Sequence, residues 1–362
     1  LSLVDSFVLP VRPAAAPVTR RILRALAPGG SLSVGPDTFA GLVSETASLG
    51  LSVQSGAPID VPGLLTMLDR FPFGCAEQTT SRALPLLYVG DLARRIGLAA
   101  DRDVPARVDE AIRTVLSFQD SSGAFGLWGP GGYDLWLTAY VMDFLTRARE
   151  RGFDVPDRAF EAGLDRLQSE LSYTANLAPG RASDVAYASA VLARNGRAAI
   201  GDLRYFAQEE SDAFESAMAK AQLGAALAAV GDSARADALF AAAASVAAAD
   251  AAPVHDVYGT RVRDAAAALA LAAENGAAAG TSARLESALE AALDRSGTER
   301  RTTQEAVWLV LAAHALGDAR GGMRLAVDGR PHDGAWFARL APAALADDPI
   351  EIANRGEETV VA

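Results

Sequence analysis

A cysteine and a glutamine three positions apart are the residues of this chain whose types and spacing could do chemistry. Cys75 and Gln78 stand in the stretch FPFGCAEQTT at residues 71–80, and Cys75 is the only cysteine among the 362 residues. A lone cysteine can form neither an internal disulfide nor a cysteine-based metal cage. Near the start of a helix the thiolate would be favoured, and a side chain three positions further on would lie one turn away.

The pair predicts an internal thioester. The Cys75 thiolate can displace ammonia from the Gln78 side-chain amide, and the short Ala76 between them does not obstruct the resulting ring. The product is an activated acyl group that transfers to an amine or to water, so it survives only where water is excluded. The aromatic residues that could shield it are Phe71, Phe73, Trp128 and Tyr133.

Two other interpretations of Cys75 remain open from the residues alone. It could be a small buried hydrophobe with no chemical role. It could also be the nucleophile of a hydrolase, which needs a base within hydrogen-bonding reach of the sulfur. Of the three histidines, only His255 lies in a predicted loop, whereas His314 belongs to an apolar helix and His332 to a terminal β region. Nothing in the sequence brings His255 to Cys75.

Charge and hydropathy exclude several classes of protein. The formal net charge is −12, so the chain lacks the basic surface that nucleic acid or an anionic membrane would attract. No apolar stretch of 18 residues is free of polar or glycine interruptions, and the N-terminus lacks the pattern of a secretory signal peptide. The chain begins without methionine and ends in a strand-like EETVVA, so we expect it to be part of a longer protein.

Lysine is almost absent from the composition. Lys220 is the only lysine among the 33 lysine and arginine residues. A general preference for arginine and alanine explains this, and so does a need to keep amines away from a reactive acyl group in the same chain. Both explanations stay open at this level.

The elements that must position the pair fall into two kinds. Residues 1–58 and 322–362 show period-two alternation interrupted by turns, as in SLGLSV at residues 48–53 and before the turn at Asp328 and Gly329. We expect these flanks to form one small, discontinuous β-sandwich. Residues 59–321 between them show helical periodicity and predict a separate helical domain that carries Cys75.

Glycine turns divide the helical part into repeated units. They occur at intervals of 35–55 residues, at Gly97, Gly152, Gly196, Gly231, Gly276 and Gly317. Each glycine is typical of a helix end, so the pattern predicts helix hairpins, about a dozen helices in all. An α/α toroid and an open solenoid both fit this periodicity.

The segment GCAEQTTSRALPLL at residues 74–87 resembles the thioester segment of the bacterial alpha-2-macroglobulin family, with Gly74, Cys75, Glu77 and Gln78 at the motif positions. The segments GAFGLWG, LTAYVMDFL and TTQEAVWLVLAA also look like that family's thioester domain, so the resemblance covers essentially the whole chain. It implies a mostly α fold: an α/α toroid inserted into a small β-sandwich, often called CUB, which the N- and C-terminal segments build.

The resemblance also implies a function. Cys75 and Gln78 would form the thioester, and the family traps proteases: cleavage of a bait segment exposes the thioester, and a lysine amine of the protease takes the Gln78 acyl group. Small amines such as methylamine would react in the same way. Such a protein is a single-use endopeptidase inhibitor without turnover and needs no cofactor or metal. It would work with the rest of the macroglobulin chain, in the periplasm or on the cell-envelope side.

Two departures from the family pattern bear on this function. The bacterial family commonly has Tyr-Pro-Tyr before Gly-Cys, where this chain has Phe71-Pro72-Phe73, so only apolar shielding would remain. The complement branch uses a downstream histidine to direct the acyl group to hydroxyls, but no histidine lies 110–120 residues after Cys75. We therefore expect amines to be preferred and aminolysis to be uncatalysed.

Two further functions stay open. Gln119, Gly123 and Phe125 resemble the Gln/Trp repeat of terpene-cyclase toroids. An enzyme of that class would need acidic clusters on the toroid, but the only adjacent Asp pair, Asp347-Asp348, falls in the terminal β region. A helical interaction scaffold with an inactive thioester motif is the other alternative.

Overall fold

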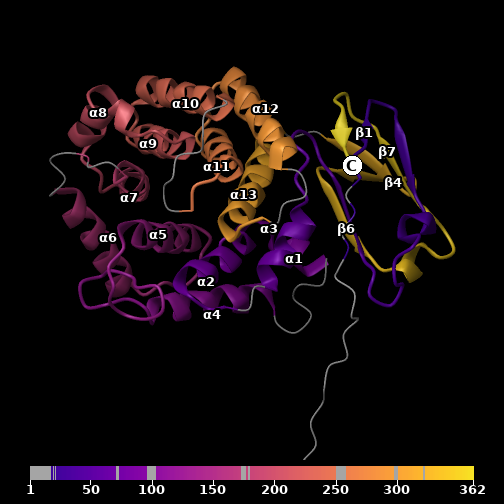
Figure 1. Ribbon diagram of the computed structural model, residues 1–362, viewed down its shortest axis with the longest axis horizontal. Coiled ribbons are helices and arrows are strands. Elements are labelled where there is room, and N and C mark those ends of the chain that lie inside the picture. The colour runs from indigo at the N-terminus through magenta and orange to yellow at the C-terminus, as the bar shows by residue number, and fades with distance from the viewer. Residues whose placement is uncertain are drawn as a thin grey trace, which may run out of the picture.

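A helical body and a smaller β unit lie side by side in the computed structural model of the chain (Figure 1). It describes residues 18, 20, 22–70, 73–95, 103–172, 177, 180–249, 258–296, 301–320 and 323–362. Phe71, His255, Gly97 and the first 17 residues of the expected N-terminal β flank lie outside these ranges.

The β unit is built by both ends of the chain. Its strands are β1 (Ala25–Leu26), β2 (Ser31–Val34), β3 (Leu49–Val53), β4 (Arg324–Val327), β5 (Arg330–Asp333), β6 (Trp336–Leu340), β7 (Ile350–Asn354) and β8 (Val360–Val361). They pair antiparallel as β1-β8, as β2-β7-β4-β5 and as β3-β6. Every strand from the N-terminal flank therefore pairs with one from the C-terminal flank, as the β-sandwich prediction requires.

The alternation in the flanks has a direct structural cause. Leu51 and Val53 of β3 turn into an apolar cluster together with Leu325, Ile352 and Val360. Successive strand residues point to opposite faces, so only alternate positions reach this core. The β4-β5 hairpin turns at Asp328 (φ 48°) and Gly329 (φ 74°), and a two-residue turn with both φ positive matches the twist of its strands.

The helical body contains thirteen α-helices within the described ranges. They are α1 (Val61–Asp69), α2 (Ala76–Ala83), α3 (Leu86–Arg95), α4 (Val104–Leu116), α5 (Leu135–Glu150), α6 (Asp157–Ser172), α7 (Ala182–Arg194), α8 (Ile200–Gln208), α9 (Ala217–Ala229), α10 (Ser233–Ala248), α11 (Arg261–Glu274), α12 (Ala279–Ser296) and α13 (Thr303–Arg320). Short 3₁₀ turns lie at Pro36–Phe39, Ser211–Ala213 and Pro342–Leu345.

These helices close into a ring. The inner helices α2, α5, α7, α9, α11 and α13 pack each against the next, and α13 returns to pack against α2. Helices α4, α6, α10 and α12 cover them from outside. Residues 262–272 of α11 are all buried: residues 265–272 are alanine and leucine, and the buried Arg263 pairs with Asp264. The fold is therefore an α/α toroid, and the open solenoid is excluded.

Most of the predicted glycine turns are confirmed. Gly152, Gly196, Gly231 and Gly276 follow helix ends with φ between 67° and 85°, the left-handed conformation that glycine adopts without strain. Gly317 was wrongly expected to end a helix, because it lies inside α13. Glycine is tolerated within a helix at a cost of about 1 kcal/mol, and the packed helix continues through it.

The helical body and the β unit share a defined boundary. Helix α1 packs against β3 and β6, and Phe337 of β6 is packed on the helical core. The Ala57 amide donates to Glu286 Oε1 of α12 at 3.0 Å. Gln54 Nε2 donates to the Ile59 carbonyl at 2.7 Å, which fixes the chain as it enters the first helix. No helix within the described ranges is both long and apolar enough to span a membrane.

Candidate functional site at the start of helix α2

Cys75 occupies the N-cap of α2. Its backbone is extended (φ −67°, ψ 165°), and the residue is only 3% exposed. The Thr79 amide donates to the Cys75 carbonyl at 2.9 Å, which opens the helix, and the Ala76 amide donates to the Leu127 carbonyl at 2.8 Å. The sulfur-bearing residue is therefore held between the first turn of α2 and the glycine-rich loop that precedes α5.

Burial determines the acidity of this thiol. It raises the pKa of Cys75 above its ordinary value. The backbone amide of Gln78 acts in the opposite sense, the nearby Glu77 carboxylate raises the pKa further, and the amide of Glu77 lowers it. The expectation that the helix start would favour the thiolate is thus wrong in its net effect, because desolvation outweighs the helix amides.

Gln78 lies in the first turn of α2, and its side chain is partly buried. Its Oε1 is fully buried and has no hydrogen-bond partner among the residues that the structure describes. An unsatisfied buried acceptor costs about 1–3 kcal/mol when nothing compensates it. The carbonyl end of Gln78 thus occupies a dry environment on the same helix turn as the sulfur.

Glu77 lies between Cys75 and Gln78 in the sequence, and its buried carboxylate holds the first turn of α2 against two other helices; we call this group the Glu77 clamp. Its Oε1 accepts hydrogen bonds from Ser81 Oγ at 2.8 Å, Thr303 Oγ1 at 2.8 Å and Gln304 Nε2 at 2.7 Å. Ser81 Oγ also lies 2.8 Å from the Tyr140 hydroxyl of α5. Three donors satisfy one buried carboxylate oxygen, so the first turn of α2 is tied to α13 and α5.

The starts of α11 and α13 are joined at the same end of the toroid. Thr302 and Glu305 form a capping box: the Thr302 amide donates to Glu305 Oε2 at 2.9 Å, and the Glu305 amide to Thr302 Oγ1 at 3.1 Å. Thr260, the N-cap of α11, donates its hydroxyl to Glu305 Oε1 at 2.8 Å. The beginning of α13 therefore contacts the first turn of α2, and the beginning of α11 contacts that of α13.

Tyr258 is the residue near this site that sequence reasoning missed. Its ring lies 5.0 Å from that of Trp136 in α5, and the residue is 45% exposed. Burial of the phenol raises the pKa of Tyr258, and the charges of Glu77 and Cys75 raise it further. Trp136 lies between Tyr258 and Tyr140, whose hydroxyl contacts Ser81 of α2. It has a φ of 60°, a conformation rare for a bulky residue and common at functional sites. No sequence signal marked it, because it lies more than 180 residues after Cys75.

The proposed shielding residues occupy different environments. Phe73 is 56% exposed and Trp128 is 65% exposed. Tyr133 is 38% exposed, and the Arg166 guanidinium of α6 lies 4.1 Å from its ring. The structure therefore places Tyr133 against α6, while Phe73 and Trp128 present apolar surface to solvent around the motif.

The glycine-rich loop has a structural explanation of its own. Gln119 Nε2 donates to the Gly123 carbonyl at 3.2 Å and to the Ala159 carbonyl at 2.9 Å, and Phe125 is fully buried. A Cβ at Gly126 would come within 2.1 Å of the Gly129 and Gly131 carbonyl oxygens, so only glycine fits there. Gln119, Gly123 and Phe125, which resemble a terpene-cyclase repeat, therefore shape this loop. The loop is joined to the start of α2 by the hydrogen bond from the Ala76 amide to the Leu127 carbonyl.

The described histidines lie away from Cys75. His314 stands eleven residues into α13, about 16 Å along the helix from its start beside Glu77, and its ring lies 4.9 Å from that of Tyr88. His332 is in β5, where its Nε2 donates to the Ala335 carbonyl at 3.2 Å. Within the described part of the chain, no group of three or more His, Cys, Asp or Glu residues is placed to hold a metal ion.

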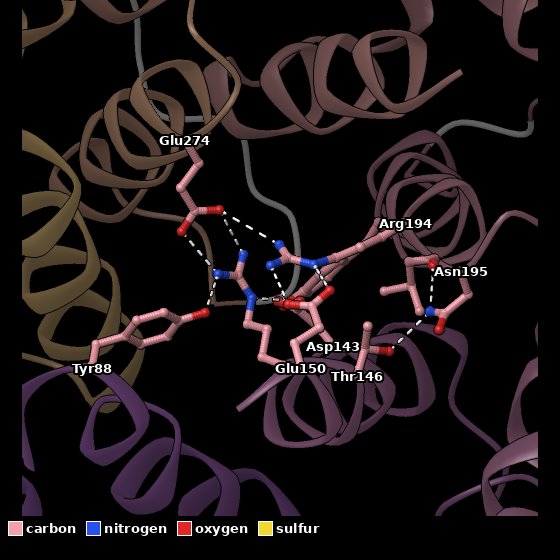
Figure 2. A network of polar contacts seen from close by, with 10 residues as sticks. Tyr88, Asp143, Thr146, Glu150, Arg194, Asn195 and Glu274 are labelled. Atoms are coloured by element: carbon pink, nitrogen blue, oxygen red, sulfur yellow. Dashed lines mark hydrogen bonds and ion pairs between the residues drawn. The ribbon is translucent and has the colours of Figure 1, made fainter. Parts of the chain in front are cut away.

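A second buried polar network lies at the other end of the toroid (Figure 2). Arg147 is 1% exposed, and its Nε donates to Asp143 Oδ1 at 2.7 Å. Its Nη1 donates to the Tyr88 hydroxyl and to Glu274 Oε1, both at 2.8 Å. Tyr187 donates to Asp143 Oδ2 at 2.9 Å, and its ring lies 6.3 Å from that of Tyr140. Aromatic contacts thus connect this network to the Glu77 clamp.

Comparisons with known proteins agree on one family. Residues 46–172 match the A-macroglobulin TED domain family. The chain is 35% identical over 237 residues to an alpha-2-macroglobulin of Escherichia coli, covering 62% of this chain and 14% of the relative. It is 32% identical over 337 residues to one of Xylella fastidiosa, covering 88% of this chain and 20% of the relative. The chain therefore spans only about a fifth or less of these relatives' length.

Solved structures give the same result. The Escherichia coli alpha-2-macroglobulin structure from domain MG7 to the C-terminus superposes with a TM-score of 0.74 at 28% identity, covering 94% of this chain and 55% of that chain. The Salmonella alpha-2-macroglobulin reacted with methylamine gives 0.76 at 31% identity, covering 94% of this chain and 23% of that chain. With the toroid, the paired flanks and these relatives together, the chain belongs to the bacterial alpha-2-macroglobulin family and contains its TED domain.

Proposed function

We propose that Cys75 and Gln78 form an internal thioester and that this chain is the thioester-bearing part of a protease inhibitor. The observation that carries the proposal is the start of α2, where a buried N-cap cysteine shares one helical turn with a buried, unpartnered Gln78 carbonyl oxygen. Neither a hydrophobic contact nor a helix cap requires both of these features together.

The chemistry balances without any additional reagent. Cys75 Sγ attacks the side-chain carbonyl carbon of Gln78, the C–N bond breaks, and the thiol proton leaves with the nitrogen as ammonia. In the second step an amine nitrogen attacks the same carbon and the C–S bond breaks. The proton lost by the amine is taken up by the sulfur, which gives a free Cys75 thiol. The amine-bearing molecule is then joined to Gln78 by an amide bond.

The environment favours a stored thioester. A thiol with a raised pKa is a poorer leaving group, so burial of Cys75 slows the loss of the acyl group to water. A thioester carbonyl is a weaker hydrogen-bond acceptor than an amide carbonyl, which suits the unpartnered Gln78 Oε1. Phe73, Trp128 and Tyr258 each have an exposed aromatic ring in this chain, and we infer that these rings pack over the turn in the resting state of the longer protein.

The relatives support an inference about which amines and which proteins react with this chain. A Salmonella relative has been solved after reaction with methylamine, and an Escherichia coli relative after activation by trypsin. We infer that this chain acts within a longer macroglobulin chain, takes lysine amines of attacking proteases, and resides in the periplasm or on the cell-envelope side. Amines are preferred over hydroxyls because an uncharged amine needs no base to attack.

Intact mass spectrometry of freshly purified protein tests the proposal. The thioester form lacks one ammonia relative to the sequence mass, and methylamine adds to Gln78 while one thiol becomes free. The Cys75→Ala variant should show neither change. A protein of full sequence mass with a thiol that titrates before any amine is added would reject the thioester and support the helical scaffold with an inactive motif.

A further inference from the structure

A cavity of about 390 Å³ adjoins the proposed thioester. Helices α2 and α4 pack on each other (Figure 1), and the cavity lies between them, closed by the end of α1 and the start of α3. Gly74, which precedes Cys75, and Thr79, which follows Gln78, both line it. Thr79 Oγ1 donates to the Gly74 carbonyl at 3.4 Å. The cavity wall therefore includes the neighbours of both reacting residues.

One face of α2 carries the reacting pair and continues into the cavity wall. Its residues stand at positions i, i+3, i+4 and i+7 and are Cys75, Gln78, Thr79 and Arg82. Arg82 also lines the cavity, one turn or about 6 Å along the axis beyond Gln78. The Cα–Cβ bonds of a helix tilt toward its N-terminus, so the Arg82 side chain starts out toward the turn that holds Gln78.

Arg82 is the charged group of this cavity that lacks a partner in the described ranges. Asp69 and Arg107, from opposite walls, form an ion pair with each other. Glu110 stands at the exposed rim and has an interaction of its own. Arg82 is partly buried, yet it makes no hydrogen bond or ion pair within the part of the chain that the structure describes. Its guanidinium is therefore available to an acceptor that enters the cavity.

The chemistry of a guanidinium determines which acceptor fits. Its planar fork of N–H donors matches a carboxylate, and such charge-assisted pairs are stronger than hydrogen bonds between neutral groups. A molecule that carries both an amine and a carboxylate can hold its carboxylate at Arg82 while its nitrogen reaches the acyl carbon of Gln78. Holding the nitrogen there raises the rate of attack, because the two groups no longer have to meet by diffusion.

We propose that Arg82 is a specificity-determining residue of the acyl transfer and favours amines that carry a carboxylate within reach, such as a protease lysine close to an aspartate or glutamate. This inference rests on the thioester proposed above. The covalent step is unchanged: the amine nitrogen bonds to the Gln78 carbonyl carbon, the C–S bond breaks, and the sulfur takes up the proton that the amine loses. The carboxylate stays bound to Arg82 without a covalent bond.

Amino acids of increasing length test the proposal against their own amides. β-Alanine, γ-aminobutyrate and ε-aminocaproate are each compared with the corresponding amide at equal concentrations of unprotonated amine, and thiol release gives the rate. The two members of a pair differ only in the carboxylate. We expect at least one amino acid to react about threefold faster than its amide in low-salt buffer, and about 0.5 M NaCl to reduce this ratio.

Two arginine variants assign the effect to one residue. Arg82→Gln should bring the ratio of the two rates to about one, because the carboxylate then has no cation to bind. Arg113→Gln removes the same charge from an exposed position of α4 outside the cavity wall and should keep the wild-type ratio. A ratio within one sample does not depend on how much of the protein is active, so partial misfolding of a variant does not imitate the result.

The inference is overturned if no amino acid reacts faster than its amide, if Arg82→Gln keeps the wild-type ratio, or if Arg113→Gln loses it as well. In each of these cases amines still add to Gln78 and the thioester stands. If no amine adds to Gln78 in the wild-type chain, the thioester is rejected and the role of Arg82 with it.

Discussion

Glu77 and Gln304 are 227 residues apart in the chain, and Gln304 Nε2 donates to Glu77 Oε1 at 2.7 Å in the core of the toroid. This bond joins the first turn of α2, where Cys75 and Gln78 lie, to the first turn of α13, the last helix of the ring. The geometry of the proposed thioester therefore depends on closure of the ring as well as on the motif itself.

Removing the Gln304 amide should loosen this turn. Gln304→Leu leaves the buried Glu77 oxygen with fewer donors, and we expect the free energy of unfolding to fall by about 1–3 kcal/mol. Loss of the thioester to water should be faster than in wild type. Chemical denaturation and the rate of thiol release in amine-free buffer measure the two effects. Gln208→Leu, at an exposed position that ends α8, is the matched control. Equal thiol release from both variants would contradict a role for the clamp.

Tyr258 should protect the acyl group through its ring. Tyr258→Ala removes an aromatic ring that lies 5.0 Å from that of Trp136, and we expect spontaneous thioester hydrolysis to rise about tenfold, equivalent to roughly 1.4 kcal/mol of barrier. Tyr258→Phe keeps the ring and should stay close to wild type. Thiol release followed over hours checks both variants. If Tyr258→Phe hydrolyses as fast as Tyr258→Ala, the hydroxyl and not the ring is responsible.

Acidity of the released thiol should depend on folding. Burial raises the pKa of Cys75 above its ordinary value of 9.0, so the folded state holds the thiol proton more tightly than the unfolded state. In methylamine-treated protein this contribution to stability is fully present below pH 9.0 and is lost as pH rises through the folded pKa, because the unfolded thiol ionises first. Iodoacetamide alkylation against pH should show a higher midpoint for the folded protein than for the denatured chain. Equal alkylation midpoints for the folded and the denatured protein would contradict a raised pKa of Cys75. The Cys75→Ala variant measures the background alkylation of other residues.

Scarcity of lysine should prevent acylation within the chain. The only lysine, Lys220, is 8% exposed, and its Nζ donates to the Ser211 carbonyl at 2.8 Å. Arg82 lies four residues after Gln78 on α2, so Arg82→Lys would place an amine next to the acyl carbon. We expect this variant to form an internal amide, with one free thiol and no change in mass from the thioester form.

Peptide mapping identifies that internal amide. Arg235→Lys in α10 introduces the same amine elsewhere in the toroid and is the control, which should keep its thioester. If neither variant forms the internal amide, an amine close to the Gln78 acyl group is not sufficient for acylation within the chain. The preference for arginine over lysine would then need no functional explanation.

Local features of the chain were predictable because neighbouring residues alone produce them. Glycine at a helix end, the Asp328-Gly329 turn and the period-two strands depend on backbone preferences within a few positions, and the structure confirms them. Gly317 shows the limit of such rules: the same residue type continues a helix when packing on both sides supports it. The net acidity of Cys75 was likewise mispredicted, since burial is a property of the whole fold.

By itself, the sequence determined the candidate chemistry: one cysteine, a glutamine three positions on, a helix to carry them, and flanks that alternate like strands. Closure of the ring was decided only by tertiary structure, because repeat spacing is the same for a solenoid and a toroid, and α13 must return to α2 to close it. That return brings Thr303 and Gln304, which lie 226 and 227 residues after Glu77, to the start of α2, and the same ring encloses a cavity at its other end. Contacts between such distant residues depend on how whole helices pack, which no local pattern encodes.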